Sequence, residues 1–232
     1  RQYCTQACLL GLKRGLDLDG NCPNVSLHQT AEGGNRHAIT IDEFVTLVDK
    51  QFRRGVYRNC IALDPFGFEG KIRSIGALFK LQLAPYGYTF VAKGTTPAHY
   101  SLLKHESLVY SRLERLQGEA VPVHLGIADL SWGNGYILPG AVYRVYMMMM
   151  AWGGEVARDK TVPDLYAEKN RLMCAMWDEG VCHPYENNPR YLWDEEAQRV
   201  MAINFDQAAF RPAPKHKRLL ALRRPARKRK RR

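Results

Sequence analysis

The sequence predicts a soluble protein of the α+β class. Segments with helical spacing of apolar residues alternate with short strand-like runs, and two of these runs have the pattern of a hairpin. The 232 residues, of which 46% are hydrophobic and 25% charged, suffice for one large domain or two small ones. The longest apolar run, residues 145–152, is far shorter than the about 20 residues that span a membrane, so we expect a buried strand there and no membrane partner.

The chain is expected to begin with an ordered-loop segment followed by a helix. Residues 1–30 are rich in Cys, Asn, Asp and Gly, which favours loops. From Ile39 to Phe52, apolar residues recur at the spacing of one helix face, and Gly55 ends this helix.

A β-hairpin is predicted next. Residues 70–83 lead from a glycine-containing loop into a strand, residues 85–87 (Pro-Tyr-Gly) form the turn, and residues 88–93 form the second strand. Because successive side chains of a strand point to opposite faces, Lys93 lies on the face opposite to Tyr88.

Residues 99–117 predict a helix whose apolar stripe contains one acidic residue, Glu106. A carboxylate that faces a core needs a cation, because an unpaired buried charge costs several kcal/mol. Lys93, on the preceding strand, is the expected partner. The alternative is an ordinary surface lysine and an ordinary helix glutamate.

The second half of the chain predicts two strands, a helix and a final strand. The strands cover residues 121–130 and 142–152, and a glycine break at Trp152-Gly153-Gly154-Glu155 ends the second one. A helix with Leu165, Leu172 and Met176 on one face runs to about Gly180. The strand at residues 200–203 leads into Asn204-Phe205-Asp206.

The net charge of +11 belongs to the C-terminal tail. Residues 211–232 hold 12 of the 34 lysines and arginines and no acidic residue, so 22 basic residues remain elsewhere against 23 acidic ones. We expect a disordered tail that binds nucleic acid or, through residues 227–232, nuclear import machinery. A merely solubilising tail is the alternative. The expected location is intracellular, in the cytoplasm or the nucleus.

The six cysteines are scattered and have no standard motif. Cys4, Cys8, Cys22 and His28 could together bind zinc, but their spacing matches no standard zinc finger. Unpaired thiols in a reducing compartment are the default, so the sequence predicts no metal site.

The order of these elements resembles the protein-kinase fold. The chain is similar in particular to the small kinase-like proteins that are abundant in filamentous fungi. This resemblance is carried by residues 4–12 (Cys-Thr-Gln-Ala-Cys-Leu-Leu-Gly-Leu) and 21–28 (Asn-Cys-Pro-Asn-Val-Ser-Leu-His). Shorter matches lie at residues 76–80, 116–122 and 151–154, so the resemblance covers nearly the whole chain.

The resemblance implies a β-rich N-lobe with one αC-type helix and a small, truncated helical C-lobe. It divides the chain into a family-specific N-terminal extension (residues 1–36), a kinase-like domain (residues 37–210) and the basic tail (residues 211–232). Little chain follows Asp206, so we do not expect the usual activation segment or the usual binding of peptide substrates.

The resemblance also implies a nucleotide site. In kinases the strand lysine pairs with the helix glutamate and holds the phosphates of ATP, and Lys93 and Glu106 match those positions. Trp152 and Gly153 match the hinge beside the adenine. Gly76 approaches the glycine-rich loop pattern, with a simple hairpin turn as the equal alternative. ATP is therefore the expected cofactor.

The catalytic positions are degenerate. The family pattern is His-x-Asp-x-x-x-x-Asn-x-Leu-Trp, followed by a strand that ends in Asp-Phe-Glu. Anchored on His183, the catalytic Asp is replaced by Tyr185, the metal-binding Asn by Arg190, and the metal-binding Asp by Asn204. Glu186, or Asp206 if the final strand continues past Asn204, could substitute.

Each replacement has a chemical cost. A phenol with a pKa of about 10 is a poor substitute for the carboxylate that accepts the substrate proton. Arg190 brings a positive charge to a cation site, and at about 4 Å two like charges cost about 4 kcal/mol at an effective dielectric constant of about 20. Asn204 offers one neutral oxygen, a weak ligand for Mg²⁺, so we expect magnesium binding to be impaired.

These observations favour a catalytically inactive, kinase-like scaffold that binds a nucleotide or an unknown protein. Two alternatives remain. The chain could be an active ATP-dependent phosphotransferase that uses Glu186 or Asp206, or a nuclear nucleic-acid-binding protein that acts through residues 211–232.

Overall fold

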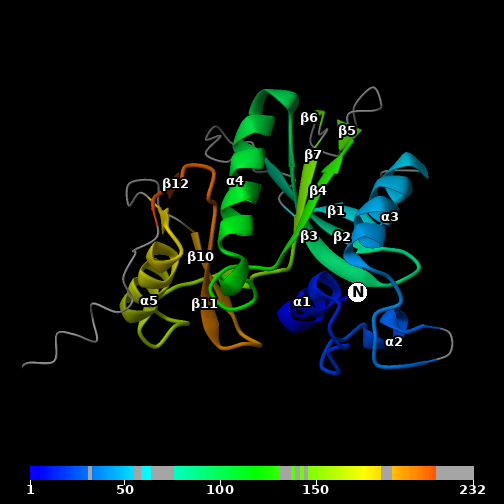
Figure 1. The fold of residues 1–232 in the computed structure, drawn as a ribbon, viewed down its shortest axis with the longest axis horizontal. Coiled ribbons are helices and arrows are strands. Elements are labelled where there is room, and N and C mark those ends of the chain that lie inside the picture. Colours follow the sequence, from blue (N-terminus) through cyan, green and yellow to red (C-terminus); the bar gives the residue numbers. More distant parts are fainter. Residues whose placement is uncertain are drawn as a thin grey trace, which may run out of the picture.

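The computed structural model describes residues 1–30, 33–54, 59–63, 76–130, 137–138, 142–143, 146–183 and 190–212. It is an α+β structure with a mainly antiparallel central sheet and a few helices (Figure 1). The helices are α1 (Gln6–Arg14), α2 (Val25–His28), α3 (Ile41–Arg54), α4 (Tyr100–Arg112) and α5 (Leu165–Asp178), with 3-10 turns η1 (Pro97–His99) and η2 (Glu114–Leu116). No described helix has the length and apolar character needed to cross a membrane.

The central sheet has five antiparallel strands in the order β1-β2-β3-β7-β4. They are β1 (Cys60–Ala62), β2 (Ala77–Leu83), β3 (Tyr88–Thr95), β7 (Tyr146–Met150) and β4 (His124–Asp129). The predicted hairpin is β2 and β3, with Leu78 opposite Lys93. Gly87 makes the turn with a φ of 72°, a conformation that favours glycine.

Helices cover both faces of this sheet, so its central strands are buried on both sides. Tyr88, Phe90 and Ala92 of β3 pack in one core with residues of α1 and α3, whereas Val91 packs in a second core with residues of α4. The four consecutive methionines of β7 alternate between the two cores in the same way. This double burial explains why residues 146–150 have an unbroken apolar sequence.

The N-terminal segment contains a helix where the sequence predicted only loops. Thr5 caps α1 by accepting a hydrogen bond from the Cys8 amide at 3.0 Å, and Gly15 ends the helix with a φ of 65°. Leu9 and Leu12 of α1 lie in the same core as the central sheet. The expected N-terminal extension therefore packs against the central sheet.

The C-terminal part contains more strand than the expected helical lobe. Its described residues form one long helix, α5, on the far side of α4 from the central sheet (Figure 1). They also form a three-stranded sheet, β11-β10-β8, and a two-stranded sheet, β12-β9. These strands are β8 (Glu155–Val156), β9 (Val181–Cys182), β10 (Arg190–Asp194), β11 (Arg199–Ile203) and β12 (Ala209–Phe210). Earlier in the chain, between β4 and β7, β5 (Ile137–Leu138) pairs with β6 (Val142–Tyr143).

Several expectations concern residues outside the described ranges. The residues concerned are Gly55, most of the glycine-containing loop before β2, Tyr185, Glu186, and residues 213–232 of the basic tail. The roles expected of them stay predictions.

Candidate functional site

The predicted ion pair between the hairpin and the following helix is present. Lys93 lies on β3 and Glu106 on α4, and the Lys93 Nζ lies 2.6 Å from the Glu106 Oε2. Only 4% of Lys93 and 1% of Glu106 is exposed. Glu106 occurs on the buried face of α4 together with Leu103 and Val109, as the apolar stripe predicted.

Glu106 also reaches a third element. Its other carboxylate oxygen, Oε1, accepts a hydrogen bond from the Phe205 amide at 3.3 Å. One buried carboxylate therefore connects β3, α4 and the segment that follows β11. Removing one partner of such a buried pair leaves an uncompensated charge and costs about 3–5 kcal/mol.

The segment Asn204-Phe205 is held from two further sides. The His183 Nε2–H donates to the Asn204 carbonyl at 2.7 Å, which links the two degenerate motifs directly. The Phe205 ring is fully buried and packs edge-on against Tyr110 at 5.1 Å and against His183 at 5.6 Å between ring centroids. The sequence motifs placed His183 and Asn204 in one site, and the structure brings them together.

The final strand ends before Asn204, so the condition under which Asp206 was considered as a substitute is not met. β11 ends at Ile203, and Asn204 has a φ of 67° in the left-handed region, which asparagine tolerates better than most residues. The alternation that would have put Asp206 on the same face as Asn204 therefore fails. Arg190 lies in β10 opposite Ile203, so its backbone is next to the strand that leads into Asn204.

The hinge-like segment after β7 is contacted by the N-terminal segment. Gln6 donates from Nε2 to the Trp152 carbonyl at 2.8 Å and accepts from the Val123 amide at 3.0 Å. The Tyr3 ring stacks on Trp152 with 4.9 Å between centroids and 8° between planes. Nothing in the spacing of Tyr3 and Gln6 pointed to these contacts, which depend on the tertiary position of α1.

The predicted glycines lie where the backbone needs space. A Cβ on Gly76 would lie 2.3 Å from the Gly94 carbonyl oxygen, and one on Gly153 would lie 2.9 Å from a methyl group of Leu192. Packing therefore accounts for both glycines without a ligand. Gly76 leads into β2 beside Lys93, so it still lies next to the ion pair.

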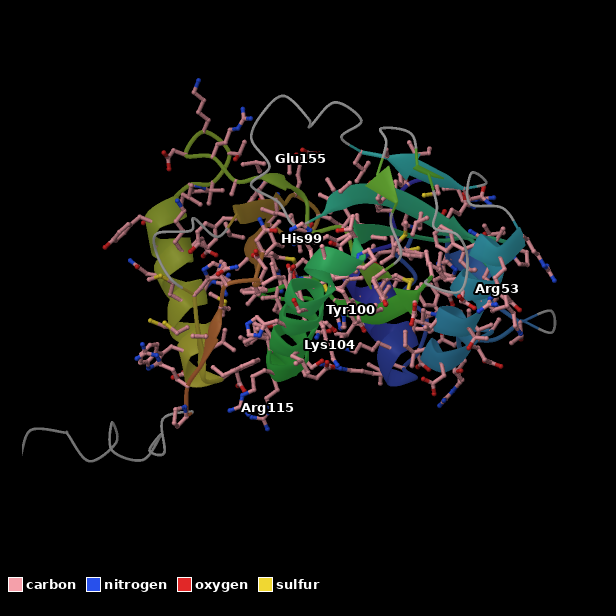
Figure 2. All side chains as sticks on the ribbon, turned by 90° about the horizontal axis from the view of Figure 1, so that it is seen from above. Arg53, His99, Tyr100, Lys104, Arg115 and Glu155 are labelled. Carbon is pink, nitrogen blue, oxygen red and sulfur yellow. The ribbon has the colours of Figure 1, made fainter. Side chains whose placement is uncertain are left out.

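A cavity of about 640 Å³ lies between the N-terminal segment, the hinge-like segment and the β10–β11 turn. Its lining includes Tyr3, Trp152, Glu155, Asp194 and Glu196 but not Lys93, Glu106 or Gly76, so it is separate from the expected phosphate site. Figure 2 shows Glu155 at the join between the central sheet and the C-terminal part. Burial and the charge of Glu155 raise the pKa of Tyr3 to about 12.

His124, a buried histidine of β4 that sequence reasoning missed, packs against α4. The His124 Nε2 is 3.1 Å from the Ser107 hydroxyl, and its ring stacks on Tyr110 at 5.6 Å. Burial, with a smaller effect of the Lys13 charge, lowers the pKa of His124 to about 4. A neutral imidazole is therefore buried against Ser107 and Tyr110 of α4.

The structure also gathers the three N-terminal cysteines and a histidine. Metal-binding atoms of Cys4, Cys8, Cys22 and His28 all lie within 4.8 Å of one another. The sequence offered these four residues as possible zinc ligands but favoured unpaired thiols, because the spacing matches no standard zinc finger.

Comparison with known proteins finds a similarity that covers almost the whole chain. No family model matches the chain. The chain is 47% identical, over 229 residues and 99% of its length, to the meiotic driver SPOK2 of Podospora anserina. It spans 29% of the length of that relative. The relative comes from a fungus, which agrees with that part of the resemblance, whereas neither comparison bears on a kinase-like fold or on an activity.

Proposed function

We propose that the chain is a kinase-like domain that binds a nucleotide or a protein partner without transferring a phosphoryl group. The observation that carries this proposal is the buried Lys93–Glu106 pair, attached through Glu106 to the Phe205 amide. In protein kinases a strand lysine, held by a helix glutamate, contacts the phosphates of ATP beside the Asp-Phe-Gly segment. The contacts of Glu106 with Lys93 and with the Phe205 amide support this comparison.

The free-energy cost of burying the Lys93–Glu106 ion pair supports a functional role for it. Desolvating two charges is expensive, and replacement of a buried ion pair by apolar residues of similar volume is often neutral or stabilising. A pair with 4% and 1% exposure is therefore a poor means of stabilising the fold. Binding of phosphates by Lys93, with Glu106 orienting the lysine, explains why both residues are charged.

The residue at the metal position supports loss of catalysis. The Asn204 side chain can offer a neutral oxygen, whereas Mg²⁺ in such sites is held by carboxylates and phosphates. The Asn204 carbonyl accepts a hydrogen bond from His183, which restrains the backbone at this position. We therefore expect nucleotide binding that does not depend on Mg²⁺.

Equilibrium binding of ATP in the presence of EDTA tests the proposal. The informative variant is the double substitution Lys93→Met with Glu106→Gln, because it removes both charges and keeps an acceptor for the Phe205 amide. The control is Lys104→Met, which removes an exposed lysine from the same helix (Figure 2). We expect the double variant to lose at least tenfold in affinity and the control to bind like the wild type. Equal binding by all three proteins would contradict the proposed site.

An active phosphotransferase that uses Asp206 is the first alternative, although β11 ends before Asn204 and does not place Asp206 on the same strand face. This carboxylate is half-buried and lies two residues after Asn204. The alternative predicts Mg²⁺-dependent transfer of the γ-phosphate of ATP to the protein or to an added substrate. Asp206→Asn would abolish that transfer, whereas our proposal expects none in the wild type.

Binding of nucleic acid through residues 211–232 is the second alternative, and the concentration of basic residues there supports it. It predicts an affinity for duplex DNA or RNA that falls steeply with salt and disappears when the tail is removed. Binding that survives removal of the tail would count against it.

The similarity to SPOK2 favours a compatible proposal for the whole protein. We propose that this chain does in its own protein what the matching 29% of the driver does there. A chimera that carries this chain in place of the matching segment of SPOK2 should still bias its transmission in crosses. A chimera that is present at the normal level but is inherited without bias would contradict this proposal.

A further inference from the structure

A cluster of three thiols and an imidazole lies on the N-terminal side of the central sheet, apart from the Lys93–Glu106 pair. It collects residues from four short pieces of chain: Cys4 precedes α1, Cys8 lies in its first turns, Cys22 lies in the following loop, and His28 ends α2. All four side chains are buried, with exposures between 0% and 3%. Thiolate sulfur and imidazole nitrogen are donor atoms that zinc takes in proteins.

The separations fit a tetrahedral metal ion. The His28 Nε2 lies 3.4 Å from the Cys4 Sγ and 3.4 Å from the Cys22 Sγ, and all four ligand atoms lie within 4.8 Å of one another. Zinc binds imidazole nitrogen at about 2.0–2.1 Å and thiolate sulfur at about 2.3 Å, which places two such ligands about 3.5 Å apart in a tetrahedron. The two nitrogen–sulfur separations are therefore close to those that the ion requires.

The orientation of His28 is fixed as in metal sites. Its Nδ1–H donates to the Tyr86 carbonyl at 2.8 Å, so the lone pair is on Nε2, which faces the sulfur atoms. Stacking on Tyr88, with 4.0 Å between centroids and 1° between planes, holds the plane of the ring. An outer partner that sets the tautomer is a regular companion of metal-bound histidine.

The sulfur of Cys4 receives additional donors. The Thr89 amide lies 3.3 Å from the Cys4 Sγ, and the Asn24 side-chain amide lies 3.5 Å from it. Hydrogen bonds to sulfur favour the thiolate, which is the form that binds metal. The surroundings of the cluster thus suit a charged sulfur even though they exclude water.

We propose that Cys4, Cys8, Cys22 and His28 bind one Zn²⁺ ion in a closed, structural site. Three thiolates and one imidazole are a ligand set of structural zinc, and four protein ligands leave no position for water or substrate. The six cysteines form no disulfide, so the three sulfurs of the cluster are available as separate ligands.

The ion would fasten the N-terminal segment to the central hairpin. The Cys4 amide already donates to the Thr89 carbonyl of β3 at 2.9 Å, and Tyr86 lies in the β2–β3 turn. Tyr3 and Gln6, on either side of Cys4 and Thr5, contact Trp152. Loss of the ion would therefore loosen the packing of the hinge-like segment as well as α1 and α2.

The test begins with the metal content of the full chain, purified under reducing conditions after growth with zinc. Elemental analysis of wild type, Cys22→Ser and Cys174→Ser is compared, since Cys174 is exposed on α5 and outside the cluster. We expect about one zinc per chain in the wild type and in Cys174→Ser, and at least a tenfold lower content in Cys22→Ser. Equal zinc in all three proteins would be an adventitious ion only and would overturn the proposal, as would its absence from the wild type.

A second measurement covers the case in which Cys22→Ser does not fold. The wild-type protein, stripped of metal under reducing conditions, is titrated with Co²⁺. Intense visible absorption with sulfur-to-metal charge transfer, saturating at one equivalent and abolished by Zn²⁺, is the expected result. A weak octahedral spectrum would overturn the proposal. So would a wild-type mass two hydrogens short, mapped by peptide analysis to a disulfide within the cluster.

Discussion

Glu106 serves different partners with its two carboxylate oxygens, which makes it the residue that joins strand, helix and the Asn204-Phe205 segment. Oε2 pairs with the Lys93 ammonium and Oε1 accepts from the Phe205 amide. A substitution that removes only Lys93 would leave this carboxylate charged and buried.

Lys93→Met should lower the free energy of unfolding by about 3–5 kcal/mol, because it leaves an uncompensated charge in the core. The double variant Lys93→Met with Glu106→Gln should recover a large part of this loss, since no charge remains. Lys104→Met should change stability by less than about 0.5 kcal/mol. Urea unfolding measures all three. A single variant no less stable than the double one would show that the pair is not buried as described.

His124 gives the protein a predicted dependence on acid. The pKa of His124 is lowered from 6.5 to about 4 in the folded state. As the pH falls below 6.5, His124 therefore binds a proton in the unfolded chain but not in the folded one. Stability is therefore lost between pH 6.5 and pH 4, by about 2–3 kcal/mol. His124→Gln should make the loss over this range smaller. Unfolding curves at pH 7 and pH 4 that change equally in both proteins would contradict this account.

At the scale of elements, the β2–β3 hairpin and α4 form the rigid frame of the site. Sequence patterns predicted both, together with the four-methionine strand, because alternation and helical spacing are local signals. β10 was missed, since residues 190–194 acquire strand character only by pairing with β11 and β8. The thiol cluster was underestimated for a similar reason: sequence spacing does not reveal that Cys4 and Cys22, which lie outside helices, meet Cys8 of α1 and His28 of α2.

A substitution of Gly76 tests how closely β2 and β3 approach each other. Gly76→Ala would place a methyl group 2.3 Å from the Gly94 carbonyl oxygen, so we expect a loss of about 1–3 kcal/mol in the free energy of unfolding. Gly20→Ala is the matched control, because no atom lies within 4 Å of its Cβ position. Thermal or urea unfolding checks both. Equal stability of the two variants would indicate that the entry into β2 is not packed against β3.

At the scale of the whole molecule, the candidate site depends on parts that are distant in the sequence. The N-terminal segment contacts the hinge-like Trp152, α4 contacts the segment after β11, and His183 connects the two degenerate motifs. Of the residues that depart from the expected kinase pattern, Arg190 lies in β10 and Asn204 directly follows β11. The Lys93–Glu106 pair, on which the proposed nucleotide site depends, joins β3 to α4.

Restoring the departed residues should therefore restore binding of the metal. The triple substitution Tyr185→Asp, Arg190→Asn and Asn204→Asp supplies the carboxylates and the amide that hold Mg²⁺ in kinases. Aspartate, like asparagine, tolerates the left-handed backbone at residue 204. Calorimetric titration should show that Mg²⁺ strengthens ATP binding to the triple variant at least tenfold and leaves the wild type unchanged. Unaltered binding by the folded triple variant would contradict the alignment of these positions.

The most direct test of the central claim is a thermal-shift titration of the purified chain with ATP, with and without Mg²⁺. At 100 times its dissociation constant a ligand adds about 2.7 kcal/mol to stability, and each kcal/mol raises the melting temperature by about 2–4 °C at this size. We predict a rise of about 5–10 °C that is the same with Mg²⁺ and with EDTA. A rise that requires Mg²⁺ would contradict a non-catalytic site, and no rise at millimolar ATP would contradict nucleotide binding at Lys93.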